Sequence, residues 1–111
     1  MAIEYFNKLS ALIETLGLEP DVFLSLKVKH YFSGAALYTN DGICATLSPA
    51  GLAFKLPEKD VRELLGSGIA VPLKYFSRGH IKKEYALFES PDLTQTNHWR
   101  KYLIEAIQFA Q

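Results

Sequence analysis

One cysteine, three histidines and twelve carboxylates are the side chains of this 111-residue chain that could carry out covalent or acid–base chemistry. A cysteine acts as a nucleophile only beside a base that generates its thiolate and a group that orients the base. No local motif places a histidine near Cys44, which lies within a predicted strand, where cysteine behaves as a small apolar residue. We therefore expect Cys44 to be structural.

The other candidates for catalysis or metal binding also lack partners. His30, His80 and His98 are far apart in the sequence and have no cysteine or carboxylate at metal-ligand spacing. Glu58 and Asp60 lie at a predicted helix start, where the helix dipole accounts for them. No glycine-rich phosphate-binding motif is present. We therefore expect no catalytic residue, no metal, no cofactor and no enzyme; an enzyme with an unrecognised site is the alternative.

Lysine and arginine side chains on the predicted strands could bind an anionic partner rather than catalyse a reaction. Residues two apart in a strand share a face, so Lys27 and Lys29 lie with Tyr31 on one side, while Lys74 points away from Leu73. If helices cover one side of the sheet, these residues populate the other side. The predicted partner or nucleic-acid surface comprises Lys27, Lys29, Tyr31, Lys55, Lys74, Phe76, Arg78, Lys82 and Lys83.

Three interpretations of this surface remain open. Cations beside aromatic rings bind phosphates and stack on bases in single-stranded nucleic acids. Lysines on an exposed strand also solvate a sheet and protect its edges from aggregation. The aromatic residues Tyr31, Tyr38 and Phe76 could instead form a dimer or partner surface, because aromatic residues are enriched in interfaces.

The composition is that of one globular domain spanning residues 1–111. Hydrophobic residues make up 49% and charged residues 22%, which excludes a disordered chain, and one cysteine excludes a disulfide scaffold. Charge is uneven: residues 27–83 hold nine cations against four acids, whereas both flanking segments are acidic. Without a targeting segment or an apolar run of membrane-spanning length, we expect a cytoplasmic protein with no membrane partner.

The elements that must position these residues follow from the periodicity of apolar side chains. Steps of three and four predict a first helix from Ile3 to Leu16. Alternation predicts one strand over 26–39 with a bend at Gly34, then strands over 43–47 and 52–56. A helix from Pro57, a hairpin of strands 71–75 and 81–88, and a helix opening at Ser90 complete the chain. This order predicts a two-layer α+β domain, α-β3-α-β2-α, with helices covering an antiparallel sheet.

Several short motifs in this order resemble the TfoX N-terminal domain family. Residues 29–34 resemble a motif of the family in which basic residues are followed by Met-Phe-Gly-Gly. Tyr31 and Ser33 differ from the methionine and the first glycine of that motif. Residues 36–42 resemble the family's Gly-Leu-Tyr-x-Asp-Gly hairpin, and residues 72–75 followed by Gly79 resemble its later hairpin. The positions that match the motifs and are expected to be structural are Phe32, Gly34, Tyr38, Gly42, Gly79 and Trp99.

The resemblance covers about residues 5–110 and implies a function as well as a fold. It implies an architecture related to secretion chaperones and a link to the regulation of natural competence in bacteria. It supplies no catalytic residue. We therefore expect a non-enzymatic regulatory or interaction domain that acts through an unidentified protein partner, with a homodimer as one form of partnership. The alternative is a nucleic-acid-binding accessory domain that uses the basic sheet surface.

Overall fold

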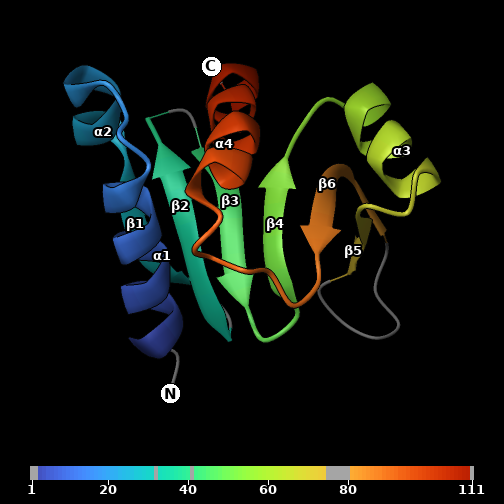
Figure 1. Cartoon of the computed structure of the whole chain (residues 1–111), viewed down its shortest axis with the longest axis horizontal. Coiled ribbons are helices and arrows are strands. Elements are labelled where there is room, and N and C mark those ends of the chain that lie inside the picture. Colours follow the sequence, from blue (N-terminus) through green and yellow to red (C-terminus); the bar gives the residue numbers. More distant parts are fainter. Residues whose placement is uncertain (1–2, 32, 41, 75–80, 111) are drawn as a thin grey trace.

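One six-stranded antiparallel sheet organises the molecule, in the order β1-β2-β3-β4-β6-β5 (Figure 1). This computed structural model describes residues 3–31, 33–40, 42–74 and 81–110, with only the backbone described for residues 81 and 82. Its elements are α1 (Ile3–Thr15), α2 (Pro20–Ser25), β1 (Lys27–Tyr31), β2 (Gly34–Thr39), β3 (Gly42–Ser48), β4 (Gly51–Lys55), α3 (Glu58–Gly66), β5 (Val71–Lys74), β6 (Ile81–Phe88) and α4 (Thr96–Ala110).

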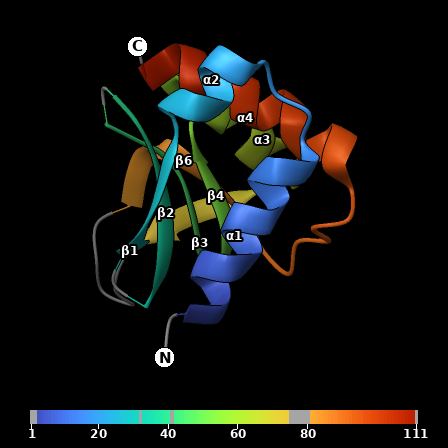
Figure 2. The same cartoon turned by 90° about the vertical axis from the view of Figure 1, so that its left-hand side faces the viewer.

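The helices lie on one side of the sheet (Figure 2). We call this side of the sheet the helix-covered face. α1 packs on β1, β2 and β3, α4 on β3 and β4, and α3 on β5 and β6. Buried α1 residues at steps of three and four, such as Leu9, Leu12 and Leu16, share a core with Phe54 of β4 and Trp99 of α4. The predicted α+β class, with helices against one antiparallel sheet, is confirmed.

The opposite side, the open face, carries its own small core. Ala53, Leu73, Tyr85 and Leu87 form a separate buried cluster there, with Val71 packed against it. β6 therefore buries side chains on both faces, because Ala86 and Phe88 belong to the core under the helices. Among the described residues, no helix has the length and apolarity needed to cross a bilayer.

The expected single bent strand over 26–39 is wrong. The chain reverses there and forms the antiparallel hairpin β1–β2, in which Tyr31 pairs with Gly34. A side chain at Gly34 would overlap the backbone at Leu47 and Ser48 of β3, which explains the glycine. Alternation of apolar residues is the same on both arms of a hairpin, so the period could not distinguish a bend from a reversal. Four strands, rather than three, therefore precede α3.

Two further expectations about helices require correction. The residues between the predicted first helix and the predicted first strand, for which no element was predicted, contain α2, a single short helix with Pro20 in its first turn. The last helix begins at Thr96 and not at Ser90, because Ser90 has φ 47°, whereas a helix N-cap needs an extended conformation. The helix expected from Pro57 begins one residue later, at Glu58, and Pro57 is its N-cap. The predicted turn over 77–80 lies outside the described residues.

Candidate functional site

The structure gathers part of the predicted surface at one edge of the sheet. The edge strand β1, at one end of the sheet order, carries Lys27, Lys29 and Tyr31, whose side chains share the open face. Both lysines are exposed, and Tyr31 is half-buried. Lys55 lies on the same face at the end of β4, where it pairs with Tyr85 and is half-buried.

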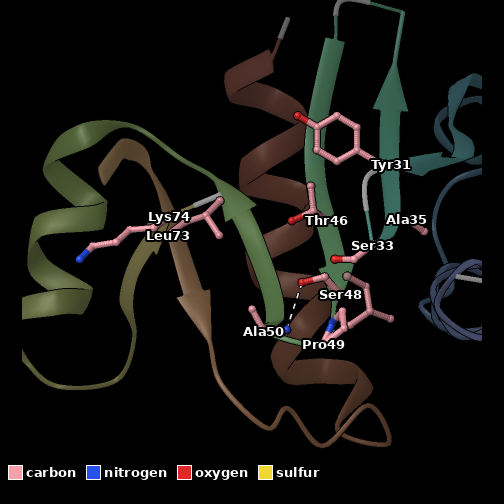
Figure 3. A pocket seen from close by; sticks show the side chains of 10 residues that line it. Tyr31, Ser33, Ala35, Thr46, Ser48, Pro49, Ala50, Leu73 and Lys74 are labelled. Atoms are coloured by element: carbon pink, nitrogen blue, oxygen red, sulfur yellow. Dashed lines mark hydrogen bonds between the residues drawn. The ribbon is translucent and has the colours of Figure 1, made fainter. Parts of the chain in front are cut away.

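The rest of the predicted surface is divided. Lys74 was expected to share a face with Lys27 and Lys29, but Leu73 points into the open-face cluster and the Lys74 side chain points away from it (Figure 3). Lys74 still lines the hollow of the open face together with Tyr31. Both faces of the β5–β6 hairpin are apolar, which is why alternation could not tell which side faces the helices. Lys83 is exposed on β6. Phe76, Arg78 and the side chain of Lys82 lie outside the described residues.

The motif positions taken to be structural have definite places in the fold. Gly34 and Gly42 begin β2 and β3, and Gly42 has a φ of 140° that favours glycine. Tyr38 lies on the open face opposite Lys27. Trp99 is buried in the core under the helices. Phe32 and Gly79 lie outside the described residues.

On the open face, β1 presents positive charge beside aromatic rings. The Lys29 Nζ lies 4.9 Å from the centroid of the Tyr38 ring, a cation–π contact. Lys27 and Lys29 have no carboxylate within salt-bridge distance in the described part of the chain, where the ion pairs are Lys8–Glu4 and Arg62–Glu58. This side of the edge can therefore accept an anionic group.

On its other face, β1 borders an apolar groove. Val28 packs against the core, and the His30 ring stacks on the Phe6 ring of α1 at a centroid distance of 4.8 Å. The α1–α2 groove, as we call it, has a volume of about 310 Å³ and is lined by side chains that include Phe6, Phe23, Leu24, Leu26 and Val28.

The helix α2 exposes unusually large apolar side chains at this groove. Leu24 is 77% exposed and Phe23 is 39% exposed. Neither residue was identified from the sequence as part of a site. The available signal was the pair of adjacent apolar residues after Pro20, but one turn of helix is too short to establish a period.

A second hollow lies on the open face between the two edges of the sheet (Figure 3). Its volume is about 610 Å³, and it is lined by Tyr31 of β1, Thr46 of β3 and Leu73 of β5. Edge strands from opposite ends of the sheet order line one cavity, so the open face is concave. Its polar side chains among the described lining residues are the hydroxyl groups of Tyr31, Ser33, Thr46 and Ser48 and the ammonium group of Lys74, with no histidine or carboxylate.

Cys44 is buried in the core, as expected. Its side chain is 0% exposed, its Sγ donates to the Leu37 carbonyl oxygen at 3.5 Å, and burial raises its pKa to about 12. Across the described ranges, no group of histidine, cysteine and carboxylate side chains is arranged to hold a metal ion.

We expect Cys44 to resist thiol reagents in the folded protein. With a pKa of about 12, the thiolate is about one part in ten thousand at pH 8, and the core excludes the reagent. Absorbance during reaction with Ellman's reagent should show slow labelling that follows unfolding, and fast labelling in urea. Rapid labelling without denaturant would contradict this prediction.

The carboxyl groups of Asp60 on α3 and Glu105 on α4 lie next to one another. Burial and the neighbouring Asp60 carboxylate raise the pKa of Glu105, and Lys101 opposes this shift. The folded state therefore binds more protons than the unfolded state above the ordinary pKa of glutamate, and stability falls as pH rises through the raised pKa.

The substitution Glu105→Gln should stabilise the protein at pH 7 and flatten this pH dependence. We expect a gain of a few tenths of a kcal/mol, because solvent screens a partly exposed pair. Urea unfolding between pH 4 and pH 8 would measure it, with Glu63→Gln in the same hollow as the control. An unchanged slope in Glu105→Gln would refute the prediction.

Comparisons with known proteins add no identification. No protein-family model matches the chain, and no curated protein sequence matches it. The resemblance to the TfoX N-terminal domain family therefore rests on the short motifs quoted above.

Proposed function

We propose that this chain is a non-enzymatic regulatory interaction domain that binds a protein partner at the β1 edge. The observation that carries the proposal is the edge itself: a terminal strand with exposed lysines on one face and an exposed apolar groove on the other. The terminal strand of a sheet offers backbone donors and acceptors to an incoming strand, and apolar side chains beside it add binding area. The exposed lysines disfavour pairing with basic or apolar strands and so select for an acidic one.

A binding role is supported over a catalytic one by the state of the candidate nucleophiles. Cys44 is buried and its raised pKa keeps it protonated. The hydroxyl groups of the open-face hollow have no histidine or carboxylate beside them among the described lining residues, and no side-chain hydrogen bond joins any of them to Lys74 in that part of the chain. The motif resemblance supports a regulatory role linked to bacterial competence. We propose the reducing cytoplasm as the location of this protein, because its single cysteine is buried and unpaired.

Site-specific photo-crosslinking in bacterial cells tests this proposal. A photoreactive amino acid replaces Leu24 at the groove or, as a control, the exposed Lys59 on α3. We expect a discrete protein adduct from position 24 that is missing from position 59. An adduct of twice the chain mass would identify the partner as a second copy. Absence of an adduct, or equal adducts from both positions, would count against the β1 edge.

Nucleic-acid binding is a second candidate, favoured by the Lys29–Tyr38 contact on the open face. The predicted cations are spread across the sheet, because Lys27 and Lys29 lie on β1 at one edge and Lys74 lies on β5 at the other. Titration of single- and double-stranded DNA at low salt decides it: binding that weakens steeply with salt would support this candidate, and no binding would remove it.

A further inference from the structure

We propose that the partner supplies an extended segment of alternating acidic and apolar residues, which adds as a seventh strand along the outer side of β1. This inference rests on the proposed function and names the chemistry of its partner. In a sheet, side chains opposite one another on neighbouring strands share a face. The two faces of β1 therefore specify two alternating kinds of residue in an added strand.

The open face specifies the acidic positions. Lys27 and Lys29 are exposed and lack a carboxylate partner within the ranges that the structure describes. Their positions two residues apart place them about 6.8 Å apart along the strand, which is the spacing of alternate residues in a partner strand. Carboxylates at those positions would meet both ammonium groups. The Lys29 ammonium group now lies over the Tyr38 ring of the neighbouring strand β2, and it would turn from that ring toward the added strand to meet a carboxylate.

The other face specifies the apolar positions. A residue opposite Val28 would face the α1–α2 groove, where Phe23 and Leu24 are exposed. The groove volume of about 310 Å³ is enough for one or two aliphatic side chains. Burying those side chains and the exposed part of Leu24 would contribute about 25 cal/mol for each Å² of apolar surface removed from water.

Charge distinguishes this partner from a second copy of β1. If two β1 strands paired antiparallel about Lys29, then Lys29 would face its own counterpart, and Lys27 would face Tyr31. Like charges directly opposite one another destabilise a strand pair. An acidic, alternating segment removes that repulsion and replaces it with attraction.

Three capped eight-residue peptides would test the inference by fluorescence anisotropy. The first alternates glutamate and valine, the second replaces each glutamate with lysine, and the third has the first peptide's composition with all glutamates before the valines. We expect the full-length protein to bind the alternating acidic peptide at least about tenfold more tightly than either of the others. A version of the first peptide with alternate N-methyl amides should lose binding, because it cannot pair as a strand.

Charge reversal at the edge makes the test independent of folding. The double variant K27E/K29E changes only exposed side chains and should invert the preference, binding the lysine–valine peptide and losing the glutamate–valine peptide about tenfold. The matched control K59E/K74E carries the same charge change elsewhere and should keep the original preference.

The outcomes separate the inference from the proposed function. Equal binding of the alternating and block peptides, or an unchanged preference in K27E/K29E, would overturn the alternating strand. If crosslinking at position 24 still captured a partner in that case, the interaction role would stand without it. A dimer that dissociates in K27E/K29E, with no peptide bound by the wild-type protein, would assign the edge to a second copy and also overturn the inference.

Discussion

Replacement of Gly51 with alanine should remove most of the stability of this protein. Gly51 begins β4 with φ 135°, a conformation that side chains other than glycine rarely adopt. A Cβ at this position would also overlap the Phe88 carbonyl group on β6. Because this obstacle is backbone and not a flexible side chain, β4 and β6 would have to separate. We expect a loss of more than about 4 kcal/mol, which is comparable to the whole stability of many small domains.

Two other glycines separate the causes of this effect. Gly42 has a similar φ of 140°, but an added Cβ would meet no atom within 4 Å, so Gly42→Ala should cost only the backbone strain of about 1–3 kcal/mol. Gly34 has no positive φ, and its Cβ would overlap the Leu47 carbonyl oxygen. Urea unfolding followed by circular dichroism would give the three losses. A Gly51→Ala loss no greater than that of Gly42→Ala would contradict the overlap.

Truncation of Trp99 should have the second largest effect. Trp99 is 3% exposed and packs against Phe54 and Phe88, with ring centroids 6.1 Å and 5.2 Å away. Its Nε1 donates to the Asp92 carbonyl oxygen at 2.7 Å, which fixes the connector between β6 and α4. Trp99→Ala should therefore cost about 3–5 kcal/mol, from lost burial and from the cavity left behind.

A conservative variant divides the Trp99 effect into its parts. Trp99→Phe keeps a ring in the core but leaves the Asp92 carbonyl group without this donor, and we expect a loss of about 1–2 kcal/mol beyond the smaller volume change. Gln108→Ala, on the exposed side of α4, should change stability by less than about 0.5 kcal/mol. Thermal and urea unfolding would measure all three variants. A Trp99→Phe loss equal to that of Trp99→Ala would show that the hydrogen bond, and not packing, dominates.

Local patterns predicted most of the elements and part of the site. The three-and-four spacing in α1 and the alternation of Leu52 and Phe54 with smaller or polar residues in β4 identify these elements, because the direction of each side chain repeats with the local backbone geometry. Burial itself does not alternate in β4, since side chains on both of its faces are buried. Lys27, Lys29 and Tyr31 were correctly placed together, since residues two apart in one strand share a face in any sheet. Cys44 was correctly expected to be structural, because a cysteine within an apolar strand segment behaves as a small apolar residue.

The features that were mispredicted depend on contacts between distant residues. Whether the chain bends or reverses between Tyr31 and Gly34 is decided by the pairing of β2 with β1 on one side and with β3 on the other, which no local period reports. The face of Leu73 is decided by its partners on β4 and β6, with Ala53 and Leu87 among them. The exposure of Leu24 is decided by where α2 lies against α1 and β1, because one helical turn has no periodic signal of its own.

The sequence by itself determined that this chain forms an α+β domain and that a positive segment includes Lys27 and Lys29, because composition and short-range spacing are local properties. Only the tertiary structure decided that β1 is an edge strand and that the α1–α2 groove lies beside it. The order of strands in a sheet is a consequence of long-range pairing and of core packing against the helices. An edge becomes a binding surface only after the other strands have found their neighbours.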